Sequence, residues 1–363
     1  MRVKLNDAFD LQMGKTPSRN DMSFWNGTNK WVSIGDLGNS DKYIENTKEC
    51  ISDDAVQSSG IKVVPKNTVI MSFKLSIGKT AITKNEIYTN EAIMAFIDNG
   101  KYEIDVNYIY HLFSGKDWSD GTNKAVLGLT LNKATLSEIE IDIPSIERQK
   151  EVATNLDKLD DLIALRKQQL SKLDELVKSR FVELFDSIDN CKISKFSDEC
   201  EEITAGGDRP KDTSEIRTED YPYPVFANAA TNEGLLCFSR EYKIEKPCVT
   251  IAARGCTVGF TAIRYEKFTP VVRLISLVPK ETITPIYLKY YIDIKMNIEG
   301  NGAAQPQLTI PMIKSMEIMV PPIELQNQFA AFVEQTDKSK LAIQKSLDEL
   351  ETLKKALMQE YFC

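Results

Sequence analysis

The sequence predicts an α+β protein in which two similar globular domains alternate with two long helices. Residues 146–185 combine an apolar heptad pattern with an absence of glycine and proline. Residues 323–362 repeat that pattern, and the stretches before the two helices place short strand candidates in the same order. The predicted domains are therefore residues 1–144, 145–186, 187–321 and 322–363.

The first helix is predicted from Ile146 to Phe185, directly after the Pro144-Ser145 pair. Its a/d seam contains Leu156, Leu159, Ile163, Leu170, Leu173 and Val177. A helix of this size is roughly 60 Å long at 1.5 Å per residue. Few single domains need such a rod, so we expect it to act as a spacer between two domains.

The second helix is predicted to be a duplicate of the first. Pro321-Pro322-Ile323-Glu324-Leu325-Gln326 repeats Pro144-Ser145-Ile146-Glu147-Arg148-Gln149, and the offset holds without a gap until Phe362 matches Phe185. The seam of this copy contains Val333, Ile343, Leu347, Leu350 and Leu357, with Lys340 and Lys354 at two further seam positions. We therefore predict that the two helices pair with each other as an antiparallel coiled coil.

The globular domains are predicted to share one order of elements. In the first domain we expect strands at 31–34, 68–73, 80–83, 92–97 and 138–144 and a helix at 107–113. In the second domain, we expect the counterparts of the later elements of this series at residues 249–263, 271–278, 285–291 and 316–321. An internal repeat this long indicates duplication of a whole unit rather than a solenoid.

Composition and charge restrict the class of protein. The chain has 363 residues, 42% of them hydrophobic, and seven cysteines without a CxxC pair, which is typical of a globular protein with free thiols in a reducing compartment. It contains no secretory signal pattern and no apolar run long enough for a membrane span, so we expect a cytoplasmic protein without membrane contact. The net charge of −8 speaks against a free-standing DNA-binding domain, but local clusters of cations govern phosphate contact.

The sequence shows no catalytic constellation. His111 is the only histidine and lies within an aromatic helical pattern, so we interpret it as a structural residue rather than a catalytic or metal-binding one. Gly206-Gly207-Asp208 departs from the nucleotide-binding glycine patterns. We expect neither catalysis nor a metal site nor a bound cofactor in this chain.

Polar loops in the two globular domains are the candidate binding elements. They combine cations with hydroxyl, glutamine and small residues, which suits contact with phosphates and base edges. The candidate DNA-binding residues are Lys15, Thr16, Ser18, Arg19, Lys74, Ser76, Lys79, Arg209, Lys211, Arg254, Thr257, Gln305 and Gln307. Each loop is also consistent with a plain surface turn.

In the order of its elements and in several short stretches of sequence, the chain resembles the specificity subunit of type I restriction-modification systems. The resemblance covers essentially the whole chain and is carried by Gly14–Arg19, Trp31–Leu37, Ala252–Gly259, Ala304–Leu308 and the twin Pro-x-Ile-Glu-x-Gln helix starts. It implies two target-recognition domains, each reading one half of an asymmetric, interrupted sequence in double-stranded DNA. It further implies that the helices dock two methyltransferase subunits, which a restriction subunit joins, and that S-adenosylmethionine binds only to those partners.

A second hypothesis remains open from the residues alone. The repeated domains could bind protein while the helices form an ordinary dimerisation coiled coil, and the acidic net charge favours such a structural adaptor. An enzyme is the weakest hypothesis because the required catalytic groups are absent from the sequence. A DNA footprint separates the first two hypotheses, since an adaptor leaves none.

Overall fold

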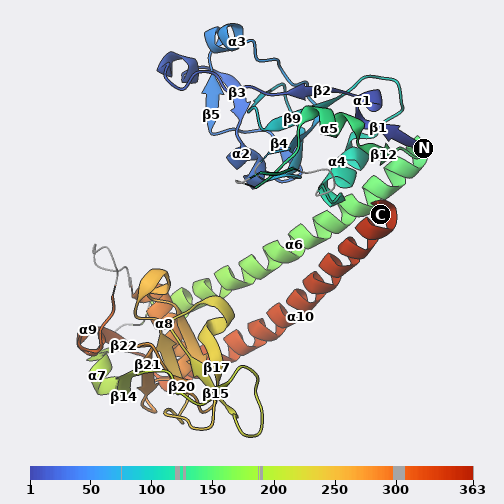
Figure 1. Ribbon diagram of the computed structural model, residues 1–363. Helices are drawn as coiled ribbons and strands as arrows, with labels where there is room; N and C mark the ends of the chain where they lie inside the picture. The colour runs from blue at the N-terminus through green and yellow to red at the C-terminus, as the bar shows by residue number, and fades with distance from the viewer. Residues whose placement is uncertain are drawn as a thin grey trace. The chain divides into compact units, whose positions relative to one another are not determined.

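The computed structural model of the chain describes residues 1–74, 76–118, 123–125, 128–186, 188, 191–296 and 307–362 (Figure 1). The chain divides into two compact units. Unit 1 consists of Met1–Lys167 and Lys345–Cys363, and unit 2 consists of Gln168–Gln344. Each long helix therefore contributes one part to unit 1 and the other part to unit 2.

Unit 1 contains a globular part built from short strands and helices. In chain order these are β1 (Arg2–Lys4), α1 (Leu5–Ala8), β2 (Phe9–Met13), η1 (Met22–Trp25), β3 (Asn29–Val32), α2 (Ile34–Asn39), β4 (Tyr43–Ile44), β5 (Glu49–Ile51), α3 (Asp53–Ser59), β6 (Val69–Ser72), β7 (Thr80–Thr83), β8 (Tyr88–Thr89), β9 (Ile93–Asp98), α4 (Val106–Gly115), β10 (Asn123–Ala125), β11 (Gly128–Thr130), α5 (Lys133–Glu138) and β12 (Glu140–Asp142). A five-stranded sheet with the order β2-β9-β6-β7-β4 forms its centre. The order β5-β3-β8 forms a second sheet, while β1 pairs with β12 and β10 with β11.

The central sheet of unit 1 is covered on both faces. Val69 and Met71 of β6 belong to the core that includes α4 and the start of the first long helix, whereas Ile70 packs in a separate cluster on the other face. A strand buried on both sides needs a continuous apolar run rather than an alternating one. This explains why all four residues of β6 are buried.

Unit 2 repeats this arrangement with one strand fewer in its central sheet. Its elements are β13 (Lys192–Lys195), α7 (Phe196–Glu199), β14 (Cys200–Ala205), β15 (Thr213–Ser214), β16 (Tyr223–Phe226), η2 (Thr231–Gly234), β17 (Leu235–Ser239), β18 (Cys248–Ile251), η3 (Gly255–Thr257), β19 (Thr261–Arg264), β20 (Thr269–Pro270), β21 (Ile275–Pro279), α8 (Pro285–Lys295), α9 (Ile310–Ser315) and β22 (Glu317–Val320). The central sheet has the order β14-β21-β18-β19, and the second sheet has the order β15-β17-β16-β20. The strand β13 pairs with β22 as β1 pairs with β12 in unit 1.

The two long helices have the predicted bounds: α6 spans Ile146–Phe185 and α10 spans Ile323–Phe362. Within unit 1, Asp160 of α6 pairs with Lys354 of α10, and Lys167, further along α6, pairs with the earlier Glu351 at 3.0 Å. Within unit 2, Asp174 of α6 pairs with Lys340 at 2.6 Å. Later residues of α6 thus pair with earlier residues of α10, which confirms the predicted antiparallel pairing. The mixed helix and strand content confirms the α+β class.

The predicted seam faces the interior in both units. Its buried members are Leu156, Leu159, Ile163, Val177, Val333 and Leu347. The remaining members are half-buried, namely Leu170, Leu173, Ile343, Leu350 and Leu357. The two seam lysines are accommodated because each meets an aspartate of the other helix instead of an apolar side chain.

Several predicted strands are shorter than the sequence suggested, and residues 271–278 form a strand only from Ile275 onward. The strand at 31–34 ends at Val32, because Ser33 caps helix α2 and forms a capping box with Asp36. The strand at 138–144 shrinks to β12, because Glu138 is the last residue of helix α5. The predicted helices at 107–113 and 285–291 are confirmed within α4 and α8.

Candidate nucleic-acid interface

In unit 1, the candidate loops leave the central sheet at one end. The strand β2 ends at Met13, which pairs with Met94, while β6 ends at Ser72, which pairs with Ile93. The segments 14–19 and 73–79 therefore begin beside the start of β9. Backbone hydrogen bonds fix them there, from Gly14 N to Ile93 O at 3.1 Å and from Phe73 N to Ala92 O at 3.0 Å.

Unit 2 places its candidate loops at the equivalent end of its sheet. Gly206 N donates to Leu274 O at 2.8 Å, as Gly14 N does to Ile93 O in unit 1. Leu308 N donates to Ala253 O at 2.9 Å, which matches the bond from Leu131 N to Phe73 O at 3.0 Å. The duplicated frame thus holds Lys74 and Arg254 at equivalent positions, one residue after Phe73 and Ala253.

Arg254 and Gln307 are brought together although they are far apart in sequence. Their backbones form an isolated antiparallel bridge, and both side chains are exposed. Arginine and glutamine are suited to bidentate contact with guanine and adenine respectively. Thr257 is half-buried in the neighbouring turn, and Gln305 lies outside the described residues.

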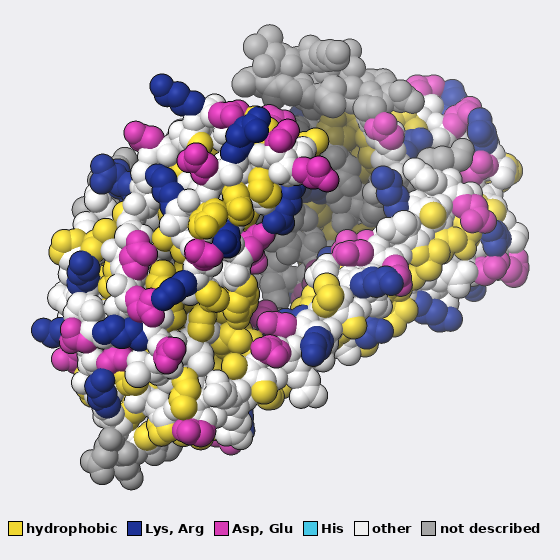
Figure 2. Space-filling model, turned by 90° about the horizontal axis from the view of Figure 1, so that it is seen from below, with side chains coloured by type: hydrophobic (Ala, Val, Ile, Leu, Met, Phe, Trp, Pro, Cys, Tyr) yellow, Lys and Arg dark blue, Asp and Glu magenta, His cyan; other side chains and the backbone are white. Residues whose placement is uncertain are grey.

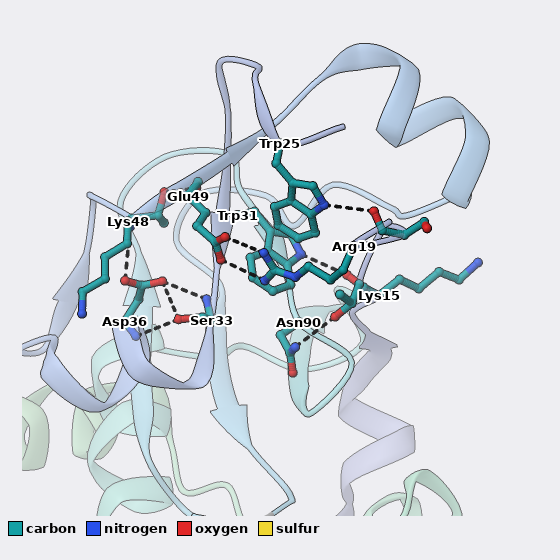
Figure 3. Close-up of polar contacts among 12 residues, drawn as sticks. Lys15, Arg19, Trp25, Trp31, Ser33, Asp36, Lys48, Glu49 and Asn90 are labelled. Atoms are coloured by element: carbon teal, nitrogen blue, oxygen red, sulfur yellow. Dashed lines mark hydrogen bonds and ion pairs between the residues drawn. The ribbon is translucent and has the colours of Figure 1, made fainter. Parts of the chain in front are cut away.

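The first loop of unit 1 is held by contacts within the protein (Figure 3). Lys15 Nζ donates to Ser59 O at 3.0 Å, and Ser18 O accepts from Trp25 Nε1 at 3.0 Å. Thr16 Oγ1 donates to the Glu91 carboxylate and accepts from Asn90 Nδ2 at 3.0 Å. The side chain of Ser18 is exposed and points to no partner among the described residues.

Arg19 is fixed in place more firmly than the other candidates. Both of its terminal nitrogens donate to the two carboxylate oxygens of Glu49, and its guanidinium lies 3.5 Å from the ring centroid of Trp25 (Figure 3). This pairing holds the pKa of the Glu49 carboxyl below its usual range. A stacked, bidentate arginine is pre-oriented, and half of its side chain remains accessible to a ligand.

The second loop of unit 1 contains the other three candidates. Lys74 is half-buried with Nζ 5.2 Å from the Phe73 ring centroid. The carbonyl of Ser76 accepts from Ser72 Oγ, and Lys79 N donates to the same hydroxyl at 3.2 Å. Lys79 has the exposed side chain and Ser76 is half-buried, so Lys79 is the more accessible cation of this loop.

The first loop of unit 2 presents two exposed cations. Arg209 donates to Thr213 Oγ1 at 3.1 Å. Lys211 lines a depression of about 300 Å³ together with Arg240 and Lys243, whereas Asp212 and Glu241 supply the opposite charge. Arg240 is paired with Asp212 at 2.9 Å, so Lys211 and Lys243 are the cations of this depression without an ion pair among the described residues.

Neither periodicity nor motifs indicated the residues that support these loops. Asn228 accepts from Ala253 N at 2.9 Å and donates to Val272 O, so it joins the loop before Arg254 to the tip before β21. At that tip, Val272 and Arg273 have positive φ angles of 51° and 61°, and Val272 is 55% exposed. A β-branched residue rarely adopts this conformation, and such strain is concentrated at functional sites.

The face of the molecule drawn in Figure 2 carries no broad field of one sign. Figure 2 shows Lys and Arg intermixed with Asp and Glu over the face in view. Contact between this face and a polyanion therefore depends on local groups of cations. Among the described residues, no group of His, Cys, Asp and Glu is arranged to hold a metal ion.

The sequence profile described as the type I restriction modification DNA specificity domain matches residues 1–175 and 189–353. The chain belongs to this family. The match covers both units, as expected from the internal repeat. Proteins of this family are specificity subunits and do not carry the catalytic activity of restriction-modification systems, so family membership agrees with the expectation that this chain is not an enzyme.

Proteins with similar sequences are named type I specificity subunits. The MjaIX specificity subunit of Methanocaldococcus jannaschii is 32% identical over 197 residues, which are 53% of this chain and 45% of that protein. A putative type I specificity subunit of Mycoplasma pneumoniae is 27% identical over 55% of this chain and 56% of its own length. The chain thus matches about half the length of these relatives. The EcoprrI specificity subunit of Escherichia coli is 23% identical over 92% of this chain and 87% of that protein.

Solved structures share the fold. The S subunit of a type I system from M. genitalium superposes with a TM-score of 0.59 at 16% identity and covers 100% of this chain and 96% of its own. A chain from a type I system studied for complex assembly and conformational transition has a TM-score of 0.65, also at 16% identity, covering 100% and 97%. None of the helices in the described part of the chain is long and apolar enough to cross a membrane.

Proposed function

We propose that this specificity subunit reads a bipartite, asymmetric target in double-stranded DNA, one half with each unit, and docks two methyltransferase subunits. A restriction subunit joins through those partners. S-adenosylmethionine binds to the methyltransferase subunits, and the complex acts in the cytoplasm. The helices α6 and α10 set the separation of the two half-sites.

The observation that carries this proposal is the duplicated sheet end with different side chains in the two units. The backbone bonds of Gly14 and Gly206, and those of Leu131 and Leu308, are equivalent. The groups they position differ, with Lys74 in unit 1 where unit 2 has Arg254. Two backbone frameworks that match but carry different polar side chains are suited to the reading of two different base sequences.

Residues 190–321 are the segment to exchange in a test. The chain is co-expressed with a methyltransferase of its system, and methylated positions in the genome are mapped by sequencing. Replacing residues 190–321 by the corresponding segment of another specificity subunit is expected to change one half of the methylated motif and to keep the other half and the spacing. The matched exchange of residues 1–144 is expected to change the opposite half.

An unchanged motif after either exchange would contradict the proposal. The adaptor hypothesis is tested on the same material by footprinting of DNA that carries the motif. An adaptor leaves no protection with or without the methyltransferase, whereas the proposed function requires two protected segments in the complex. Methylation that requires this chain but leaves no footprint from it would favour the adaptor.

A further inference from the structure

The two central sheets differ at one edge. In unit 1, β7 pairs with β6 on one side and with the parallel strand β4 on the other. The equivalent strand of unit 2 is β19, which pairs with β18. Among the described strands, β19 has no neighbour on its second side. An open strand edge presents unpaired backbone donors and acceptors to other chains.

The missing strand has a simple origin in the sequence. In unit 1, helix α2 and strand β4 are both contained in residues 33–48, between β3 and β5. The corresponding connection in unit 2, between β16 and β17, consists of residues 227–234 and forms only the short turn η2. In this connection Glu233 of η2 binds the side chain of Arg264 in β19, but no described residue of the connection pairs with β19 as a strand.

In unit 1, the strand β4 occupies the edge of β7 that corresponds to the open edge of β19. Residues 42–44, at β4, accept backbone hydrogen bonds from residues 82–84, at the end of β7. The bonds run from Ile82 N to Lys42 O at 2.8 Å and from Lys84 N to Ile44 O at 3.1 Å. The side chain of Lys42 then reaches α6 and binds both oxygens of Asp157 at 2.6 and 2.7 Å. With this cover in place, Ile82 is fully buried.

Unit 2 has counterparts of Ile82 and Asp157, but no strand equivalent to β4 pairs with β19 among the described residues. Ile263 is the counterpart of Ile82 and is only half-buried, and the next exposed position is Tyr265. The counterpart of Asp157 is Glu334 on α10, because the two long helices repeat without a gap. Glu334 and Asp337 line a groove of roughly 750 Å³ along β19, together with Glu233, Lys289 and Lys338. Lys289 is paired with Asp293, Glu233 with Arg264 and Asp337 with Lys340. Among the described residues, Glu334 is therefore the carboxylate of this groove without an ion pair, and Lys338 is the corresponding cation.

We propose that the β19 edge of unit 2 is a docking site for an extended segment of a partner protein. The segment adds to β19 as a parallel strand, places a lysine or arginine against Glu334, and follows it with an aromatic or aliphatic residue over Ile263. Strand addition of this kind takes its affinity from backbone hydrogen bonds and its selectivity from alternate side chains. The inference is independent of the proposed DNA reading.

The test uses the full chain and a fluorescent peptide with the sequence of residues 39–48, which contains the Lys42-Tyr43-Ile44 strand. Saturable binding by anisotropy is expected, with slower hydrogen exchange at the amides of Ile263 and Tyr265. Glu334→Lys is expected to weaken binding about tenfold, and a peptide carrying Lys42→Glu to recover it in that variant. Glu324→Lys is the matched control, because Glu324 is exposed on the same helix away from the groove.

Several outcomes overturn the proposal. They are the absence of binding, equal binding by Glu334→Lys and the wild type, and protection confined to Ile82 and Lys84 of unit 1. Dimers of the chain that the peptide dissociates would assign the edge to a second copy instead. A peptide N-methylated at Ile44 tests strand pairing without altering the protein, and undiminished binding of this peptide contradicts the proposal even if Glu334→Lys fails to fold.

Discussion

Gln149 on α6 and Gln326 on α10 make the same three hydrogen bonds in the two units. Gln149 Oε1 accepts from Asp105 N, and its Nε2 donates to Glu103 O and Pro144 O, each at 2.9 Å. Gln326 binds Thr284 N, Thr282 O and Pro321 O at the same distances. Both side chains are fully buried. Each glutamine therefore joins the start of a long helix to the segment that leads into α4 or α8.

Gln326→Leu is expected to lower the free energy of unfolding by about 2–3 kcal/mol, because three buried or partly buried backbone groups lose their hydrogen bond to the glutamine. Urea unfolding followed by circular dichroism measures this loss. Gln328→Leu is the matched control, since Gln328 is exposed two residues later on the same helix. Equal stability of the two variants would show that the buried hydrogen bonds contribute nothing net.

The ion pair between Asp160 and Lys354 is expected to stabilise unit 1 modestly. Each side chain is 32% exposed, so solvent screening limits the coupling to about 0.5–1 kcal/mol. A double-mutant cycle with Asp160→Ala and Lys354→Ala measures it from urea unfolding. The exposed pair Lys345–Glu349, 3.9 Å apart, serves as the control and should show a coupling near zero. A coupling no larger than that of the control pair would contradict the prediction.

His111 is expected to make unit 1 less stable as the pH falls. Burial lowers the pKa of the imidazole from 6.5, and this outweighs the opposing effect of Asp157, whose carboxylate lies 2.6 Å from Nε2. Lys42, which binds the same carboxylate, lowers the pKa further. The unfolded chain then binds more protons than the folded one, so the free energy of unfolding decreases below about pH 6.5.

The pH dependence is measured from urea midpoints between about pH 7.5 and 5.5. His111 is the only histidine of the chain, so His111→Gln is expected to flatten the profile in this window. The pKa of Asp157 is lowered by its neighbours, and its contribution is therefore lost only at more acidic pH. Stability that rises on acidification would mean that Asp157 raises the imidazole pKa above its ordinary value.

Arg254→Ala is expected to weaken the preference for one half of the methylated motif by about tenfold and to leave the other half unaffected. The reason is the exposed position of Arg254 beside Gln307 at the sheet end of unit 2. Competition between duplexes that differ in one half-site measures the effect. Lys267→Ala is the control, because Lys267 follows β19 at the opposite end of the sheet and pairs with Glu245. Equal losses at both half-sites would assign Arg254 to folding or to general phosphate contact.

The long helices were predictable to the residue because both begin after a proline and carry an uninterrupted heptad pattern. The repeat also predicted the equivalence of the candidate loops. The pairing of Arg19 with Glu49 and Trp25 was not predictable, since it depends on side chains from three separate segments. The strand that ends at Val32 was overextended because Ser33 and Asp36 form a local cap that competes with strand propensity. The predicted roles of the loop residues remain predictions.

Unit 2 is one continuous stretch of chain, whereas unit 1 needs residues from both ends. Leu357, Met358, Tyr361 and Phe362 of α10 pack against the core of unit 1. During synthesis, a ribosome therefore releases all of unit 2 before it releases the last segment of unit 1. The half of the protein that is translated first is completed last, and until then its apolar surface for α10 is open to other chains.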